Sequence, residues 1–191
     1  MNPLRNLPLE KLWSGLISQI ADFPWHNCVE PADQEWKWGI SQRWLASFCR
    51  DWAKHDWQGV VSRLDTFKHI HTTDGLGGLY LPAGSNAPLI VLLHGWPSTV
   101  LEFDHIAQSL QAKGLSVLIP ALPGYPLSGP CSGPVGPADA ACLISQLIDC
   151  TGHRSFIVHG GDWGAEIAVW MGLLSSGRCR GVHGDARTCR Q

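Results

Sequence analysis

The stretch His159-Gly160-Gly161-Asp162-Trp163-Gly164 decides the fold. It lies between a short apolar run, residues 155–158, and a helical pattern at 165–174. Glycines around a central acidic residue, between a strand and a helix, are typical of a tight turn that pushes its central side chain out at the carboxyl edge of a sheet. The pattern predicts that Asp162 is a nucleophile, in a turn that Gly160, Gly161 and Gly164 permit.

The residues before this turn extend it into an α/β fold. Continuous apolar runs at 88–93, 115–119 and 155–158 predict strands buried on both faces, and helical spacing is found at 100–111, 140–148 and 165–174. Residues 67–71 and 79–81, with a glycine-rich turn between them, predict a hairpin. Alternating strands and helices predict a doubly wound sheet, which we assign to residues 65–183.

A tryptophan-rich helical region, residues 1–64, precedes this core. Apolar residues three and four apart predict a first helix, from Leu9 to Ile20, with Pro8 in its first turn. Aromatic residues every four positions predict a second helix from Asp33, its N-cap, to Lys54, and a third spans 56–64. We expect the aromatic side chains to pack against a neighbouring surface.

Composition excludes several classes of protein. The net charge of -2 gives no basic footprint for nucleic acid, and no apolar run reaches the ~18 residues of a membrane span. No signal-peptide pattern is seen at the N-terminus. The 7 cysteines are scattered without a C-x-x-C pair, which argues against a zinc site and for reduced thiols. The sequence therefore predicts a soluble, cytoplasmic protein without metal or cofactor.

A second motif, His94-Gly95-Trp96-Pro97, follows the first predicted parallel strand. In a sheet of this kind, the loop after that strand and the residue after the nucleophile each supply one backbone N–H to an oxyanion hole. The two donors are the backbone N–H groups of Trp96 and Trp163. His94, Gly95 and Pro97 are expected to support the loop. Each donor typically stabilises the transition state by ~3 kcal/mol. A carboxylate that attacks carbon forms an alkyl ester that water must cleave, which suits epoxides or carbon–halogen bonds.

Five segments together resemble the epoxide hydrolases of the microsomal and juvenile-hormone type, over roughly residues 8–183. They are residues 56–57, 67–69, 94–97, 122–125 and 160–164. The resemblance implies an α/β-hydrolase fold with an epoxide hydrolase N-terminal domain and a small apolar epoxide substrate, hydrolysed to a vicinal diol. It also implies an Asp nucleophile, a histidine base with an acidic partner, and lid tyrosines that bind the epoxide oxygen. Of these family roles, only the nucleophile, Asp162, and the two oxyanion-hole positions, Trp96 and Trp163, can be assigned to residues of this sequence.

This sequence departs from the family in two loops and at its end. Ser98 and Pro126-Leu127 stand where many relatives have Gly and Gly-Phe, which puts substrate preference in doubt. The acid and the histidine should follow Asp162, yet only 29 residues do. We therefore expect an incomplete, C-terminally truncated sheet, an open edge at the strand of Phe156, and an atypical tail at 184–191. His183 and Asp185 are poor candidates for base and acid, and His159 is expected to be structural.

Three hypotheses remain open. The chain is an epoxide hydrolase fragment with negligible turnover, a haloalkane dehalogenase-like hydrolase, or a non-catalytic, degenerate α/β-hydrolase fragment. The tryptophan-rich region and the Gly-Gly-Asp-Trp-Gly motif favour the first over the second. The missing histidine favours the third for the chain as it stands.

Overall fold

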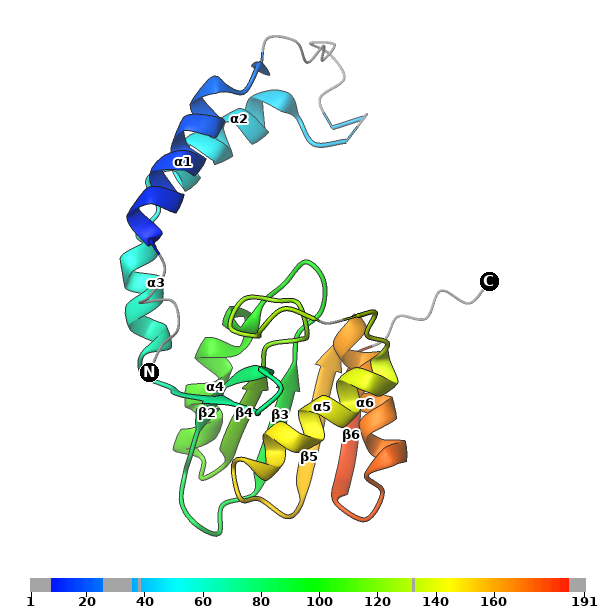
Figure 1. Cartoon of the computed structure of the whole chain (residues 1–191). Coiled ribbons are helices and arrows are strands. Elements are labelled where there is room, and N and C mark those ends of the chain that lie inside the picture. The colour runs from blue at the N-terminus through cyan, green and yellow to red at the C-terminus, as the bar shows by residue number, and fades with distance from the viewer. Residues whose placement is uncertain (1–7, 26–35, 38, 132, 186–191) are drawn as a thin grey trace. The chain divides into compact units, whose positions relative to one another are not determined.

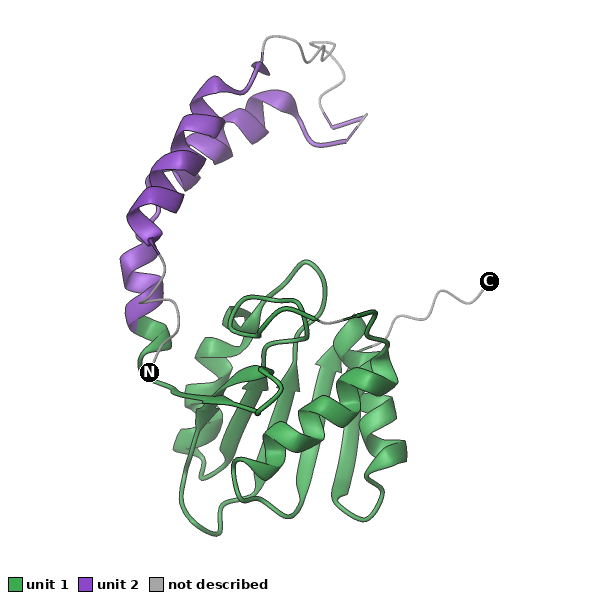
Figure 2. Cartoon of the chain, in the orientation of Figure 1, with its two compact units in different colours: residues 1–2, 63–191 green, residues 3–62 purple. Residues whose placement is uncertain are grey.

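The computed structural model describes residues 8–25, 36–37, 39–131 and 133–185 (Figure 1). The chain divides into two compact units, one of residues 3–62 and one that contains the residues from Arg63 onward (Figure 2). The division falls within helix α3, Trp57–Leu64. The first unit is helical, and the second contains the sheet.

Helices α1, Leu9–Asp22, and α2, Gln42–Trp52, form most of the first unit. Helix α1 follows Pro8 and ends before Phe23, close to its predicted bounds. Helix α2 begins only after Ser41, whose side chain accepts a hydrogen bond from the Trp44 N–H, so the predicted helix at 33–54 is wrong for the described residues before Ser41. Trp36 and Gly39 have φ values of 70° and 127°, outside the range of a right-handed helix. Asp33, the predicted cap, lies outside the described residues.

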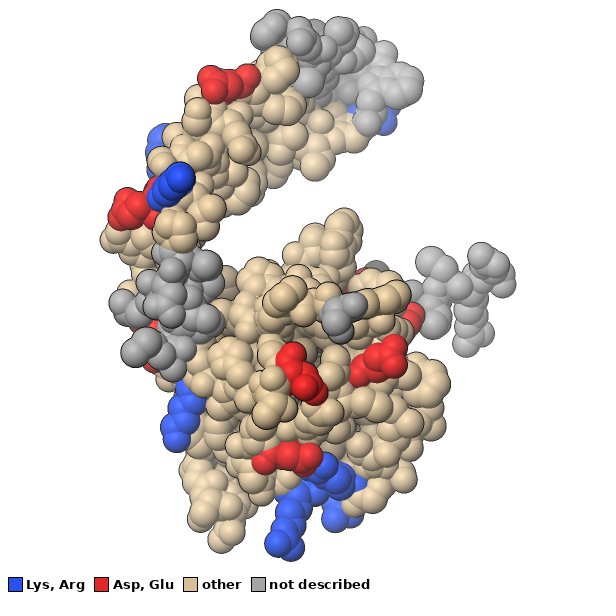
Figure 3. Space-filling view, in the orientation of Figure 1, with Lys and Arg blue, Asp and Glu red and all other residues tan. Residues whose placement is uncertain are grey.

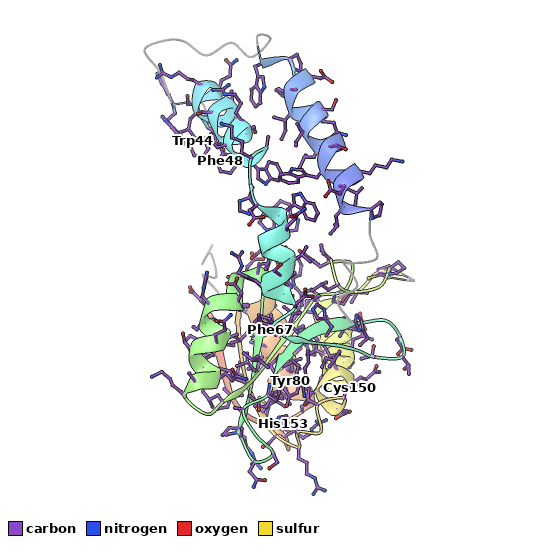
Figure 4. All side chains as sticks on the ribbon, turned by 90° about the vertical axis from the view of Figure 1, so that its left-hand side faces the viewer. Trp44, Phe48, Phe67, Tyr80, Cys150 and His153 are labelled. Atoms are coloured by element: carbon purple, nitrogen blue, oxygen red, sulfur yellow. The ribbon has the colours of Figure 1, made fainter. Side chains whose placement is uncertain are left out.

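The aromatic side chains of α2 lie at the surface of this unit. Trp44 and Phe48 stack with ring centres 5.3 Å apart, on the side of α2 that faces away from α1 (Figure 4). They are 47% and 50% exposed, so they pack on each other and not within a core. Helix α3 starts one residue later than predicted, after Asp56, whose carboxylate accepts a hydrogen bond from the Gly59 N–H at 2.9 Å.

Within the described residues, a six-stranded sheet in the order β1-β2-β4-β3-β5-β6 forms the second unit. The predicted hairpin is present as β1, Lys68–His71, and β2, Gly77–Leu81, and β2 also pairs antiparallel with β4, Ser116–Pro120. Strand β3, Leu89–Leu93, lies between β4 and β5, Phe156–Gly161, and is parallel to both. Its continuous apolar run fits this central position, because both of its faces are covered.

Helices cover both faces of the sheet. Helices α5, Pro137–Asp149, and α6, Trp163–Leu174, lie side by side on one face, and α4, Asp104–Ala112, lies on the other (Figures 1 and 4). The predicted helix at 100–111 begins with a 3₁₀ turn, η3, Val100–Phe103, before α4. The main core forms between the sheet and the α5–α6 face; its largest fully buried side chains include Leu89, Leu93, Leu118, Ile144, Leu147, Ile148, Phe156 and Met171.

The last strand corrects one prediction. Strand β6, Cys179–Asp185, pairs in parallel with β5 along its whole length, from Phe156 to Gly161, so the predicted open edge at β5 is wrong. The register shifts once, between Phe156 and Ile157. Strand β6 includes Gly184 and Asp185, and residues 186–191 lie outside the described residues. The edge strand beside β5 is therefore β6.

Surface features of the described residues complete the picture. Cys49, Cys131, Cys142, Cys150 and Cys179 have free thiols. On the face shown in Figure 3, the sheet-containing unit carries side chains of both charges. In the part of the chain that the structure describes, no helix has both the length and the apolar character needed to cross a bilayer.

Candidate functional site

Asp162 occupies a strained turn between β5 and α6. Its φ and ψ are 52° and -126°, a sparsely populated conformation for a residue with a side chain. Two glycines allow the chain to turn this tightly: a Cβ at Gly160 would overlap the Gly164 backbone, and a Cβ at Gly164 would overlap the carbonyl of Leu93. Gly161 has open space around it, so the turn does not need a glycine there for lack of room. The turn brings Asp162 to the carboxyl end of β5, beside the end of β3.

The loop after β3 contacts the Asp162 carboxylate directly. The Trp96 N–H donates a hydrogen bond to Asp162 Oδ1 at 2.9 Å. Gly95 permits this approach, because a Cβ there would collide with the Asp162 side chain. The peptide bond between Trp96 and Pro97 is cis. The sequence predicts that the Trp96 N–H lies near Asp162, and the structure brings these two groups together across 66 residues.

Two backbone donors lower the pKa of Asp162. Hydrogen bonds from the N–H groups of Trp96 and, more weakly, Trp163 hold this pKa below its ordinary value of 3.8. Desolvation acts in the opposite direction, but it is the smallest of the three effects because the carboxyl group is exposed to solvent. Asp162 is therefore an ionised, accessible carboxylate at neutral pH, which is the form that attacks carbon.

His94 ties the loop after β3 to the loop after β4. Its ring is buried, its Nε2 accepts a hydrogen bond from the Leu122 N–H at 3.2 Å, and its Nδ1 lies 3.1 Å from the Gly95 carbonyl oxygen. Because Nε2 is an acceptor, the proton of the neutral ring is on Nδ1, which donates to Gly95. Burial lowers the His94 pKa below its ordinary value of 6.5, against the opposing effects of the Gly95 carbonyl and Glu102.

Tyr125 joins this arrangement from the loop after β4. Its ring contacts the His94 ring edge-on, with ring centres 4.8 Å apart. Burial, and then the negative charge of Asp162, raise the Tyr125 pKa above 10.0, so the hydroxyl group keeps its proton at neutral pH. Sequence reasoning did not assign Leu122 or Tyr125 to the site. The Leu-Pro-Gly-Tyr segment, residues 122–125, contributes to the resemblance, but the motif does not reveal that Leu122 and Tyr125 contact His94.

The remaining candidate residues lie elsewhere. His159 Nδ1 is 2.7 Å from His183 Nδ1 on β6, and the His159 ring also contacts Phe103 edge-on. Asp185 pairs in register with Gly161. In the described ranges, no hydrogen bond joins Asp162 to a histidine, and no three His, Cys, Asp or Glu side chains gather as a metal site. The geometry therefore supplies an exposed carboxylate with two backbone N–H donors.

Comparison with known proteins gives this geometry a family. Residues 9–103 match the family described as "Epoxide hydrolase N terminus", and residues 88–188 match "alpha/beta hydrolase fold", which covers more than half of the chain. The chain belongs to the alpha/beta hydrolase fold family. The two matched ranges of this α/β hydrolase overlap at residues 88–103, which include β3 and the His94–Pro97 loop.

Named relatives point the same way. This α/β hydrolase is 29% identical over 170 residues to Epoxide hydrolase 1 of Sus scrofa, covering 79% of this chain and 37% of that protein. It is 28% identical over 162 residues to the juvenile hormone epoxide hydrolase of Bombyx mori, covering 77% and 35%. The crystal structure of the silkworm enzyme superposes with a TM-score of 0.81 and 25% identity, over 92% of this chain and 50% of that one. The resemblance to epoxide hydrolases is confirmed, and the chain spans half or less of these relatives' length.

Proposed function

We propose that this chain carries the nucleophilic part of an epoxide hydrolase site, in which Asp162 opens an epoxide to form an alkyl ester. One observation carries the proposal: the ionised, exposed carboxylate of Asp162, in the strained turn, accepts a hydrogen bond from the Trp96 N–H at 2.9 Å. In a hydrolase of this fold, that position belongs to the nucleophile and these donors. The epoxide hydrolase relatives support an epoxide as the electrophile.

The chemical steps can be written for the residues present. A carboxylate oxygen of Asp162 bonds to an epoxide carbon as that carbon's bond to the ring oxygen breaks, and the released alkoxide takes a proton from water. Hydrolysis of the ester by a second water would release the diol and regenerate the carboxylate. The N–H groups of Trp96 and Trp163 would stabilise the oxyanion of that second step.

The second step needs a base that the described residues do not place at Asp162. A positioned base typically contributes ~10²–10⁴-fold, so ester hydrolysis is expected to be slow and turnover negligible. The chain should then stop at the ester, which makes the first step observable by itself. We propose His94, Gly95, Pro97, Gly160, Gly161 and Gly164 as supports of the turn and the loop, and not as reacting groups.

Intact mass spectrometry tests the proposal. The folded 191-residue chain and its Asp162→Asn variant are incubated with styrene oxide and, separately, with 1-chlorobutane. We expect an adduct of one epoxide on the wild-type chain, none on the variant, and peptide mapping that places it on Asp162. Absence of any Asp162 adduct in protein shown by circular dichroism to be folded would refute the proposal.

The haloalkane tests the alternative reaction, in which Asp162 displaces a halide. A carboxylate that displaces chloride leaves an ester whose alkyl group has no added oxygen, so its mass differs from that of the epoxide adduct. An Asp162 adduct from 1-chlorobutane but not from the epoxide would favour a haloalkane dehalogenase-like reaction. Inertness toward both reagents would favour a non-catalytic role for this chain.

A further inference from the structure

An apolar pocket lies beside the nucleophile, on the α5–α6 face of the sheet-containing unit. It is formed by the loop after β4, the start of α5 and the start of α6, and its volume is about 160 Å³. No charged side chain lines it among the described residues. The residues that line it include Leu122, Tyr125, Val135, Ala140, Trp163 and Ile167.

The pocket and the nucleophile share residues. Trp163 directly follows Asp162; its backbone N–H donates a hydrogen bond to the carboxylate, and the residue also lines the pocket. Tyr125 also lines the pocket, and it is close enough to Asp162 for the carboxylate charge to raise its pKa. A molecule whose reactive carbon meets Asp162 therefore has this pocket within reach of its substituent.

The floor of the pocket is held firmly. Leu122, Ala140 and Ile167 are at most 4% exposed and belong to the main core. The Leu122 backbone is also fixed by the hydrogen bond from its N–H to His94 Nε2. The rim is looser, because Val135 and Trp163 are 38% and 51% exposed. A rigid floor of this kind binds an apolar group with little cost of reorganisation.

We infer that this pocket binds an apolar substituent of about the size of a phenyl ring, on the epoxide carbon chain that Asp162 attacks. The inference rests on the proposed function, and it narrows the substrate class to aryl or compact branched-alkyl epoxides. Size supports it, since an apolar cavity of about 150 Å³ accommodates benzene in another protein. Chemistry supports it too, because the lining offers apolar surface with one phenol, Tyr125, and no charge.

The first test compares two epoxides on the intact chain. Rates of Asp162 alkylation by styrene oxide and by propylene oxide are measured by intact mass, and each is divided by the epoxide's rate with free acetate. We expect a corrected preference of about tenfold for styrene oxide, the scale of discrimination that apolar pockets give. Equal corrected rates for the two epoxides would overturn the inference.

A pair of matched variants locates the preference. Val135→Phe fills the pocket from its exposed rim, whereas Val169→Phe makes the same change at a 53% exposed position on α6 that does not line it. We expect Val135→Phe to remove most of the corrected preference for styrene oxide over propylene oxide, and Val169→Phe to retain it. If both variants behave alike, the pocket is not where the phenyl group binds.

A binding measurement keeps this inference separate from the proposed function. The Trp163 indole resonance, identified by its loss in Trp163→Phe, is followed by NMR during titration with the unreactive 1-phenylethane-1,2-diol and with propane-1,2-diol. A shift with the phenyl compound alone supports the pocket even if Asp162 alkylates with neither epoxide, a result that would count only against the proposed chemistry. No shift of Trp163 with the phenyl compound would overturn the pocket.

Discussion

At the scale of single residues, the site depends on backbone atoms that approach one another closely. The turn at Asp162 holds a non-glycine residue at a positive φ, which costs of the order of 1–3 kcal/mol. The surrounding structure must offset that energy, and the close backbone approaches at Gly160 and Gly164 leave no room there for a side chain. These two positions are therefore more sensitive to substitution than Gly161, although all three belong to one motif.

Gly160→Ala is expected to destabilise the chain by at least about 2 kcal/mol, because the added methyl group would overlap the Gly164 backbone and force it to move. Gly161→Ala is the matched control, and it should change the free energy of unfolding by no more than about 0.5 kcal/mol. Urea denaturation of the two variants measures both values. Similar losses in the two would show that crowding at Gly160 is not what the turn depends on.

His94 makes stability depend on pH. Its pKa is lowered in the folded chain, so the unfolded chain binds the proton more readily, and this contribution to stability is complete above about pH 6.5 and is lost as the pH falls below it. Protonation would put a hydrogen on His94 Nε2, so that this nitrogen could no longer accept the hydrogen bond from the Leu122 N–H. His69 and His153 have lowered pKa values as well and act in the same direction, so the effect of His94 must be isolated.

The difference in unfolding free energy between wild type and His94→Gln isolates it. The wild-type chain should be the more stable at pH 7.5, and the gap should shrink on acidification below pH 6.5, by at most about 1.4 kcal/mol per pH unit. Thermal unfolding from pH 7.5 to 5 measures the gap. A gap that stays constant with pH would mean that folding does not lower the His94 pKa.

At the scale of elements, helix ends were harder to predict than strands. The apolar runs at 88–93 and 115–119 mark β3 and β4 within a residue or two, because strands buried on both faces need uninterrupted apolar residues. In α2, the four-residue spacing of aromatic side chains continues back through Trp36 and Ile40, which lie outside the helix. Gly39 at a φ of 127° breaks the helix, and only local backbone geometry reveals that break.

The site, too, has features that the sequence predicts and features that it does not. The position of Asp162 and the bond from the Trp96 N–H could be predicted, because both follow from strand ends that lie side by side in a parallel sheet. The hydrogen bond between His94 and Leu122 and the contact of Tyr125 with His94 could not be predicted. They depend on the path of the loop after β4, and a Pro/Gly-rich loop has no periodicity from which its path could be derived.

Asp56 provides a test at the element scale. Asp56→Ala removes the acceptor for the Gly59 N–H at the start of α3, and it should cost about 1 kcal/mol. Asp51→Ala is the control: its carboxylate pairs with Lys54 at 3.5 Å on the surface, and its loss should change stability by at most about 0.5 kcal/mol. Far-ultraviolet circular dichroism during heating measures both. Equal effects would mean that the Asp56 cap does not stabilise α3.

At the scale of the whole molecule, apolar side chains remain on the surface. On α6, Val169, Trp170, Leu173 and Leu174 are between 40% and 65% exposed, and Val182 of the neighbouring β6 is 44% exposed. An apolar surface of this kind promotes association. The stability of the fold and its tendency to associate are therefore expected to be separable properties.

The double variant Leu173→Lys, Leu174→Lys is expected to stay monomeric at concentrations where the wild-type chain associates, with little change in melting temperature. Gln146→Lys, Ser176→Lys adds the same charge at exposed polar positions and controls for net charge alone. Light scattering after size exclusion, over a range of protein concentrations, measures the association. If the control is equally effective, the added charge and not the apolar surface explains the result.

The place of β3 at the centre of the sheet affects how the chain folds as it is made. Trp96 and Asp162 are 66 residues apart, which is roughly 3–13 s of synthesis at 5–20 residues per second. For that interval the edge of β3 that receives β5 is unpaired and apolar, although its other edge can already pair with β4. A chaperone that holds extended apolar strands would protect the nascent chain during this interval, and slower translation between the two motifs would lengthen its exposure.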